Sequence, residues 1–322
     1  MTAITRRGLL AASLLPTIAQ AQPQQAGPLR LIVGFAPGGT ADVVARLAAA
    51  EMGRTLGRTV VVENRSGASG NLATLALLQQ PADGTTMAMA GLQLVTNPGL
   101  IGQLGYDPRT DLEMVGQLTA LPVVVMASAR SGITTMAEAI ARAGAGDGIR
   151  IATAGLGTSS YLGAELMFRA LGGRFEAVQY RGGAPAFQAL MTGDVEMMFD
   201  LVAAYQAPAA AEGRIRMLGV MQAARTPGLP DVPSFGELGL PPAAMMRSWQ
   251  GICVRASTPP VVVAALHAAT RVAVQAPEFQ QRMANLAIEA TASPDPAAFQ
   301  KFYMAELQRW TGLIHDAGIR AQ

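Results

Sequence analysis

The sequence predicts an α/β protein in which a mostly parallel sheet is covered by helices. Short apolar runs alternate with segments of helical periodicity, which is the rhythm of βαβ units. Half of the 322 residues are apolar and 14% are charged, so much of the chain should be buried. A mature chain of about 300 residues is longer than one ordinary domain and long enough for two hydrophobic cores.

The first residues carry the features of an export signal. Arg6 and Arg7 precede an apolar run over Gly8–Ile18, and Ala19-Gln20-Ala21 matches a cleavage site. The run is shorter than the roughly 20 residues needed to cross a bilayer. We therefore expect a cleaved signal peptide over residues 1–21 and a location in the periplasm. The Arg-Arg pair fits both Sec and twin-arginine signals, so the export route stays open.

The predicted strands are short apolar runs separated by turns and helical segments. Val43–Met52 and Tyr161–Leu171 are two of these helical segments. The strands are expected at Leu29–Phe35, Val60–Glu63, Thr86–Ala90, Val123–Ser128, Ile149–Ala154, Ala177–Tyr180, Met197–Asp200, Ile215–Val220 and Gly251–Val254.

The C-terminal third is predicted to be helical. Thr258 can cap a helix whose first turn holds Pro259, and a second helix starts at Asp295-Pro296 and ends near Gly318. Apolar residues recur along one face of each helix, where we expect them to form core and to have no functional role: Val262, Leu266, Val274, Phe299, Tyr303, Leu307, Trp310 and Ile314.

Charge and cysteine content argue against several classes of function. The chain has 24 Lys and Arg against 22 Asp and Glu, and loss of Arg6 and Arg7 leaves 22 against 22. A neutral mature chain gives no electrostatic support for binding nucleic acid or a membrane surface. Cys253 is the only cysteine, and His267 and His315, both on predicted helices, are expected to pack or lie at the surface. We expect no disulfide, metal site or cofactor, and little room for a Ser-His-Asp hydrolase.

Two predicted strands each lead through a loop of glycines and hydroxyl residues into a helix. The first loop spans Phe35–Asp42 (FAPGGTAD) and the second spans Thr153–Ser160 (TAGLGTSS). A helix N-terminus presents unpaired backbone N–H groups and a partial positive charge, so each loop is a potential anion site. Two such loops in one exported chain predict a small anionic ligand held from both sides.

Individual residues of the first loop have distinct expected roles. Gly38 and Gly39 let the backbone approach an anion closely, and Pro37 stiffens the approach. Thr40 can cap the helix or donate its hydroxyl. Asp42 lies in the first helical turn, where a carboxylate favours the helix dipole, so we expect it to cap or brace the lobe and not to contact the ligand.

The second loop repeats this design with other residues. Gly155 and Gly157 loosen the turn, and Thr158 and Ser159 can direct hydroxyl and N–H groups into a cleft. Thr153 lies at the end of its strand, where open α/β sheets bind ligands.

These loops belong to a longer series of motifs that resembles a known family. In their order and spacing the motifs resemble the periplasmic solute-binding receptors of tripartite tricarboxylate transporters, the Bug or TctC-like family, from about Leu29 to Ile319. The motifs that carry the resemblance are Phe35–Asp42, Val60–Arg65 with Gly67 and Gly70-Asn71, Pro81–Gly84, Tyr106–Pro108, Thr153–Gly155, Gly157–Ser159, Tyr180–Ala186, Met198–Asp200, Leu229–Pro233 and Ser248-Trp249.

The resemblance implies a periplasmic-binding-protein (Venus-flytrap) fold, type II-like, with two α/β lobes joined by crossover strands. We assign residues 28–121 plus 250–322 to one lobe and 122–249 to the other. The implied function is capture of a small carboxylate, an organic acid or acidic amino acid, for delivery to membrane subunits, with no catalysis; we expect a monomer. The ligand-binding residues expected are Phe35, Ala36, Pro37, Gly38, Gly39, Thr40, Thr153, Ala154, Gly155, Gly157, Thr158, Ser159, Tyr161, Arg181 and Asp200.

Four residues near the expected cleft allow more than one interpretation. Family members often have His where Tyr161 stands, and tyrosine favours a bulkier or more apolar acid. Arg181 can pair with a second ligand carboxylate or form an ion pair at the surface or hinge. Asp200 can accept from a ligand amine, as the resemblance implies for acidic amino acids, or order a neighbouring loop. Trp249 can wall the cleft or fill the hinge core.

Other functions are weighed against the receptor. Gly155–Ser160 has two glycines of a dinucleotide fingerprint but Ser160 in place of the third, and Tyr161 replaces the final glycine of a nucleophile elbow, so an α/β enzyme is poorly supported. A ligand-loaded sensory adaptor for a membrane histidine kinase would have the same residues. The loops would also tolerate phosphate or sulfate, whereas the resemblance favours carboxylates.

Overall fold

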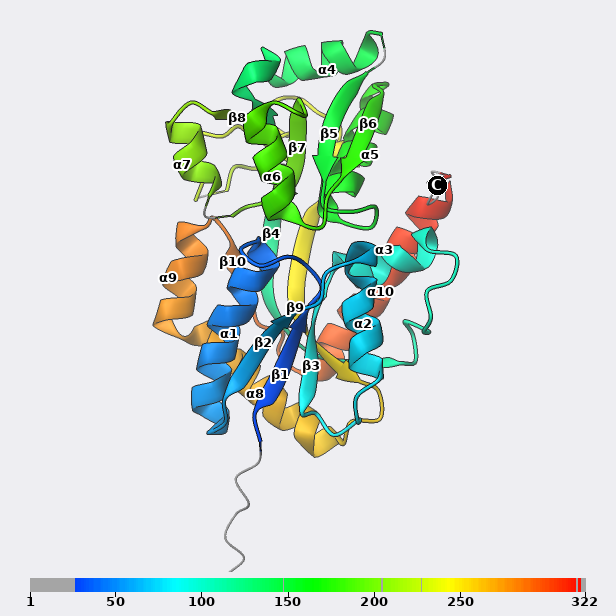
Figure 1. Cartoon of the computed structure of the whole chain (residues 1–322), viewed down its shortest axis with the longest axis vertical. Coiled ribbons are helices and arrows are strands. Elements are labelled where there is room, and N and C mark those ends of the chain that lie inside the picture. Colours follow the sequence, from blue (N-terminus) through cyan, green and yellow to red (C-terminus); the bar gives the residue numbers. More distant parts are fainter. Residues whose placement is uncertain (1–26, 147, 204, 227, 317, 320–322) are drawn as a thin grey trace, which may run out of the picture.

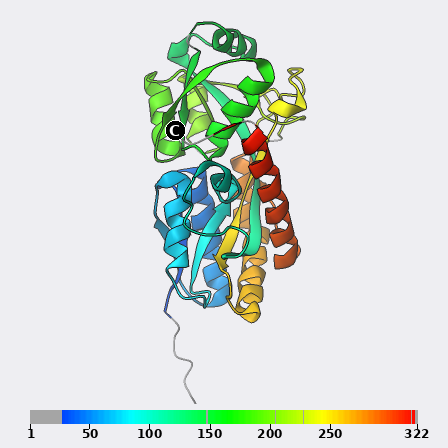
Figure 2. The ribbon, with the colours of Figure 1, turned by 90° about the vertical axis from the view of Figure 1, so that its right-hand side faces the viewer.

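The computed structural model describes residues 27–319 except 147, 204, 227 and 317 (Figure 1). The predicted signal peptide lies outside these residues. The described chain forms two α/β lobes, one above the other in Figures 1 and 2. None of the described helices is both long and apolar enough to cross a membrane.

The first lobe is built on a sheet with both faces buried. Its strands are β1 (Leu29–Val33), β2 (Val60–Asn64), β3 (Thr86–Gly91), β9 (Arg247–Arg255), the first part of β4 (Leu112–Ser128) and the short β10 (Glu289–Ala290), in the order β2-β1-β3-β9-β4-β10. Its helices are α1 (Thr40–Leu56), α2 (Asn71–Leu78), α3 (Leu92–Leu100), α8 (Pro260–Gln275), α9 (Pro277–Asn285) and α10 (Pro296–Asp316).

Alternate residues of the first-lobe strands enter two different cores. Leu31 and Met87 pack with α1 and α8, whereas Ile32 and Ala88 pack with α2, α3 and α10. This alternation follows from the two-residue period of a strand, and it explains why the strands are apolar on both faces.

The second lobe is smaller and repeats the plan. The second part of β4 pairs with β7 (Met197–Leu201) and β8 (Ile215–Val220), and β5 (Ile149–Thr153) and β6 (Phe175–Gln179) extend the sheet beyond β7. The helices of this lobe are α4 (Met136–Gly144), α5 (Ser159–Leu171), α6 (Gly183–Thr192) and α7 (Gln206–Ala211).

The long strand β4 links the two sheets. It pairs with β9 from Leu112 to Pro122 and with β7 from Val123 to Ala127. The sequence prediction of a strand over Val123–Ser128 found only the part of β4 in the second lobe, and Gly251–Val254 is only the middle of β9. The other seven predicted strands overlap β1–β3 and β5–β8.

The expectation of a mostly parallel sheet is wrong. Of the nine strand pairings between described elements, five are antiparallel. Most antiparallel pairs arise where β4 and β9 carry the chain between the lobes. In the first lobe β9 runs away from the junction, so it is antiparallel to β3 and β4. In the second lobe β4 runs away from the junction, so it is antiparallel to β7 and β8. The outer strands β1–β3 and β5–β7 end at the junction and are parallel, as βαβ units require.

The C-terminal helices follow the sequence prediction closely. Phe299, Tyr303, Leu307, Trp310 and Ile314 are all buried on α10. The predicted cap at Thr258 is wrong, because its hydroxyl donates to the Arg255 carbonyl and α8 is preceded by Pro259 at the N-cap.

The two histidines lie as expected, one packed in the core and one at the surface. His267 is buried with Nδ1 2.8 Å from the Val115 carbonyl oxygen, and His315 is exposed.

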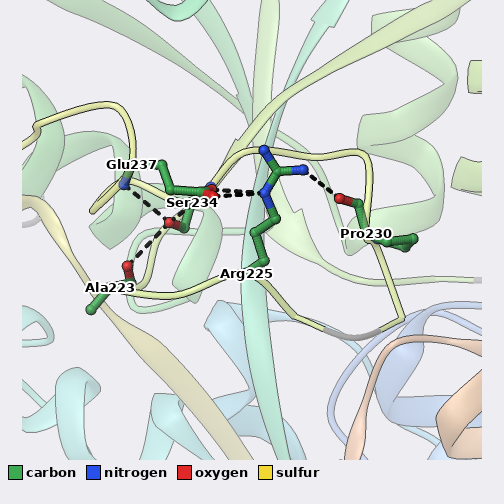
Figure 3. A network of polar contacts seen from close by, with 5 residues as sticks. All are labelled: Ala223, Arg225, Pro230, Ser234 and Glu237. Carbon is green, nitrogen blue, oxygen red and sulfur yellow. Dashed lines mark hydrogen bonds and ion pairs between the residues drawn. The ribbon is translucent and has the colours of Figure 1, made fainter.

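A polar network orders the long connection between β8 and β9 (Figure 3). Arg225 Nε donates to both carboxylate oxygens of Glu237 at 2.9 Å, and its Nη1 donates to the Pro230 carbonyl. Ser234 donates its backbone N–H to Glu237 at 2.8 Å and its hydroxyl to the Ala223 carbonyl at 3.1 Å. These bonds hold a segment without long helices against the second lobe, next to the point where the chain returns through β9.

Candidate ligand-binding cleft

A cavity of about 70 Å³ lies between the two lobes, with room for several water molecules or a small organic ion. It is lined by the N-termini of α1 and α5, the start of α6, the turn between β3 and α3, the end of β7 and the start of β9. The lining residues are Phe35, Gly39, Thr40, Ala41, Met89, Ala90, Gly91, Leu92, Gln93, Ala154, Thr158, Ser159, Gly183, Asp200, Leu201, Ser248, Trp249 and Gln250.

The structure places the predicted site residues in two groups. Those that line the cavity are Phe35, Gly39, Thr40, Ala154, Thr158, Ser159 and Asp200. Those that lie outside its lining are Ala36, Pro37, Gly38, Thr153, Gly155, Gly157, Tyr161 and Arg181. A ligand-binding role for any of these residues stays a prediction.

The first loop presents its backbone amides to the cavity from Gly39 onward. Gly38 has a φ of +83° and donates its N–H to Asp42 Oδ2 at 3.0 Å, so its amide is occupied inside the loop. Gly39 is the N-cap of α1, and no side chain caps the helix. The N–H groups of Gly39, Thr40 and Ala41 have no hydrogen-bond partner in the described part of the chain. Three free donors at a helix N-terminus make this wall electropositive.

Asp42 braces this loop as the sequence predicted. Besides Gly38, it accepts from Arg46 Nε at 3.0 Å and from Asn64 Nδ2 at 2.9 Å, and Asn64 also donates to the Phe35 carbonyl. Burial alone would raise the pKa of Asp42, but the hydrogen bonds from Arg46, Gly38 and Asn64 outweigh it and lower that pKa. The carboxylate therefore stays ionised and fixes the loop shape.

The second loop uses its hydroxyls largely for its own structure. Thr158 Oγ1 donates to the Gly155 carbonyl at 2.6 Å and lies 2.8 Å from Ser160 Oγ, and Ser160 Oγ accepts from the Ala154 N–H at 2.7 Å. The backbone N–H groups of Ser159 and Ser160, in the first turn of α5, find no partner among the described residues. Backbone donors are thus the main groups that this loop offers to an anion.

Two threonine hydroxyls join the lobes beside the cavity. Thr40 Oγ1 donates to the Val202 carbonyl at 2.6 Å, and Thr96 Oγ1 donates to the Gly157 carbonyl at 2.5 Å. Each bond runs from the first lobe to the second, and both hydroxyls are buried. These bonds hold the two lobes in contact beside the cavity, and we call this arrangement closed.

Glycines make this close approach possible. A Cβ at Gly155, whose φ is +123°, would lie 2.6 Å from Ser69 Oγ of the first lobe. A Cβ at Gly157 would clash with Asn97 Oδ1 and lie 2.9 Å from Thr96 Oγ1. The structure thus gives these two glycines a place in the contact between lobes, which the sequence did not reveal.

Tyr161 and Arg181 lie outside the cavity, in different surroundings. Tyr161 is half-buried and packs edge-on against Phe175, with ring centroids 5.9 Å apart. Arg181 is exposed just before α6. Thr153 is buried at the end of β5, and its hydroxyl has no hydrogen-bond partner among the described residues.

Sequence reasoning missed the turn between β3 and α3, which supplies Gly91 and Gln93. On β9 it singled out Ser248-Trp249, with Trp249 as one candidate for the cleft wall, but it did not predict that Gln250 also lines the cavity. Gly91 at the end of a predicted strand was a usable signal, but no hydroxyl residues accompany it. Trp249 both lines the cavity and packs against Phe299 at 5.6 Å between ring centroids, so its two expected roles are combined.

Asp200 carries the one ionisable side chain among the residues that line the cavity. Asp200 at the end of β7 is buried and accepts the Leu201 N–H at 2.8 Å. Burial raises the pKa of this carboxyl to about 7, despite the opposing effect of that hydrogen bond. Among the described residues no group of three or more His, Cys, Asp or Glu is placed to hold a metal ion.

Two α/β lobes that close over a cavity faced by helix N-termini define the class of two-lobed solute-binding receptors. Comparison with known proteins gives the family: the chain belongs to the tripartite tricarboxylate transporter receptors, TctC, whose family model matches residues 44–319. The matched stretch begins just after the first glycine loop. The predicted family and the periplasmic-binding-protein fold are confirmed, and the protein is a solute-binding protein and not an enzyme.

Solved structures agree along nearly the whole chain. The periplasmic binding protein BugD is 30% identical and superposes with a TM-score of 0.86, covering 92% of this chain and 99% of that one. MatC of Rhodopseudomonas palustris, solved with bound malate, is 31% identical with a TM-score of 0.84, covering 89% and 98%. A further R. palustris protein, solved with adipate, is 29% identical with a TM-score of 0.87, covering 93% and 100%.

Proposed function

We propose that this receptor captures a small carboxylate in the cavity between its lobes. The observation that carries the proposal is the convergence of two helix N-termini, one from each lobe, on one cavity. The free backbone N–H groups of residues that line it are those of Gly39, Thr40 and Ala41 from the first lobe and Ser159 from the second. Such donors suit a carboxylate because they are fixed, carry partial positive charge and need no counter-ion side chain. The malate and adipate held by the two R. palustris proteins support the same ligand class.

The expected affinity follows from the number of donors. A hydrogen bond to a charged group is worth about 1.5–3 kcal/mol, and a helix terminus adds about 0.3–1 kcal/mol. Four or five net contacts give roughly 8 kcal/mol after the cost of ordering, which corresponds to a dissociation constant of about 1 μM.

We also propose where the receptor works and which partner receives its ligand. The receptor would work as a monomer in the periplasm after removal of residues 1–21 and deliver its ligand to the membrane subunits of a tripartite tricarboxylate transporter. Its lobes would comprise residues 28–121 plus 250–322 and residues 122–249. The change of pairing partner on β4 between Pro122 and Val123 supports this division. Closure would create a surface that only the loaded receptor displays.

A thermal-shift screen of the mature protein tests the proposed ligand class. Malate, adipate, other organic acids and amino acids are compared with inorganic phosphate, sulfate and a neutral sugar. At about 100 times its dissociation constant a ligand adds about 2.7 kcal/mol to the free energy of unfolding, so at least one carboxylate should raise Tm by several degrees. Stabilisation by the sugar or an inorganic anion alone would contradict the proposal.

The contacts between lobes give a second test. Thr96→Val removes the hydroxyl that reaches the Gly157 carbonyl, and Thr40→Val removes the one that reaches the Val202 carbonyl. Each buried hydrogen bond is worth about 0.5–1.5 kcal/mol, so each variant should weaken carboxylate binding roughly two- to tenfold by isothermal titration. Thr134→Val, at an exposed position of the second lobe, is the control and should bind as the wild type does. Unchanged affinity in both cleft variants would show that these bonds do not stabilise the loaded state.

A further inference from the structure

The cleft contains one ionisable side chain, and its charge has the sign of the proposed ligand. Of the 18 residues that line the cavity, Asp200 alone can ionise. Its Oδ1 accepts from the Leu201 N–H, and no arginine or lysine in the described part of the chain is close enough to affect its pKa. An ionised Asp200 would therefore face an anionic ligand with only the partial positive charge of the α6 N-terminus to offset its own charge.

Asp200 is buried and closely surrounded by α6 and Tyr205. A Cβ added at Gly183, the first residue of α6, would clash with Asp200 Oδ2 and lie 3.2 Å from Tyr205 Oη. Both polar groups thus lie around one point at the α6 N-terminus. Tyr205 Oη is buried and has no hydrogen-bond partner among the described residues.

Neighbouring elements supply no cation that would keep Asp200 ionised. The residues of β4 beside β7, together with α6 and α7, contain no ionisable side chain. Tyr205 is titratable; burial raises its pKa, and the charge of Asp200 raises it further. The titratable and charged side chains of β5 and α5, the other two elements packed against β7, all lie outside the cavity lining: Arg150, Tyr161, Glu165 and Arg169. Those of α1, which faces Asp200 across the cavity, lie outside the lining as well: Asp42, Arg46, Glu51 and Arg54.

We propose that the receptor takes up one proton from solvent together with its carboxylate ligand, and that Asp200 holds this proton inside the closed cleft. The inference rests on the proposed function. Closure excludes water, so two carboxylates in the same cavity cannot both stay ionised at low cost. The proton removes the repulsion and makes Asp200 a hydrogen-bond donor. The receptor would therefore bind a fully ionised acid tightly only when Asp200 is protonated in the complex.

The pH dependence of affinity measures this coupling. In an open, solvated cleft the pKa of Asp200 should be near its ordinary value, whereas burial raises that pKa to about 7 in the closed protein. Affinity for the best acid of a panel led by malate and adipate should therefore be flat below the lower pKa, and the dissociation constant should rise by up to about tenfold per pH unit as the pH increases above it. Isothermal titration in buffers of different protonation enthalpy should show uptake of up to one proton per ligand in the pH range between the two pKa values.

Asp200→Asn separates this role from a structural one. The amide mimics the protonated carboxyl, so the variant should bind with an affinity that does not change with pH, and at about pH 8.5 it should bind the acid at least tenfold more tightly than the wild type. Asp231→Asn, at an exposed position of the same lobe, should keep the wild-type pH profile. Circular dichroism and Tm of the unliganded variant check that it folds.

Three results would overturn the inference while leaving the proposed function intact. They are carboxylate binding by the wild type without pH dependence, no proton uptake, and weaker binding by Asp200→Asn at every pH. The last result, with an amino acid as the best ligand, would assign Asp200 to a ligand ammonium group. If no carboxylate binds at any pH, the proposed function fails as well. An Asp200→Asn variant that does not fold leaves the wild-type proton count to decide.

Discussion

Gly39→Asp is expected to abolish carboxylate binding while the protein remains folded. Gly39 is the N-cap of α1, with φ −77° and ψ 169°, a conformation open to any residue, and a Cβ there would meet only the Ala36 carbonyl oxygen, 3.7 Å away. Aspartate is also a favoured N-cap residue. Its charge, however, would occupy the anion position. At about 4 Å and an effective dielectric constant of about 20, repulsion costs about 4 kcal/mol, or roughly a thousandfold in affinity.

The neutral variant Gly39→Asn provides the matched control. It adds a side chain of the same size at the same N-cap, so any loss through steric filling appears in both variants and only the charge differs. Isothermal titration with the best carboxylate should show at least a hundredfold difference between them. Equal affinities for the two variants, with both folded by circular dichroism, would remove the first loop from the anion site.

Gly157→Ala is expected to weaken binding by obstructing closure. The φ of Gly157 is outside the left-handed region, so the second lobe tolerates alanine, but the new methyl group would clash with Asn97 across the cleft. Overpacking of this kind costs about 1–3 kcal/mol, which predicts an affinity loss of roughly tenfold or more. Small-angle X-ray scattering should show that the variant stays more open when ligand is added.

A second substitution tests whether the clash is the cause. Asn97→Ala removes the atom in the way, so Gly157→Ala combined with Asn97→Ala should bind more tightly than Gly157→Ala alone. Gly144→Ala, at a glycine of the same lobe with open space around it, should bind as the wild type does. A Gly157→Ala protein with native affinity would mean that closure does not depend on the contact between α3 and the loop before α5.

The sequence was a good guide wherever structure depends on neighbouring residues. Apolar runs located nine of the ten strands of the described chain, all except the two-residue β10, and the periodicity of α10 identified its five core residues. The order of the glycine loops gave the family. Strand direction was predicted wrongly. The crossing of β4 and β9 between the lobes depends on pairing between distant segments, and no local pattern records such pairing.

The candidate site shows the same division at finer scale. The loop patterns predicted that Gly39 and Thr158 belong to the cleft, because strand–glycine–helix junctions are local signals. They could not show that Asp42 occupies the Gly38 amide, or that Gly157 faces Asn97 of the other lobe. Gln93 and Gln250 were not predicted because no local pattern marks a single glutamine, and Gly91 follows a predicted strand without the hydroxyl residues that mark the other two loops.

The sequence by itself determined the α/β class, the receptor family and the two helix N-termini on which an anion site depends, since each is written in spacing and residue type. Only the tertiary structure decided which donors remain free and that Asp200 stands without a cation. The contacts responsible join residues far apart in the chain, such as Thr40 and Val202 at a separation of 162 positions, and their formation depends on how two separately packed lobes meet.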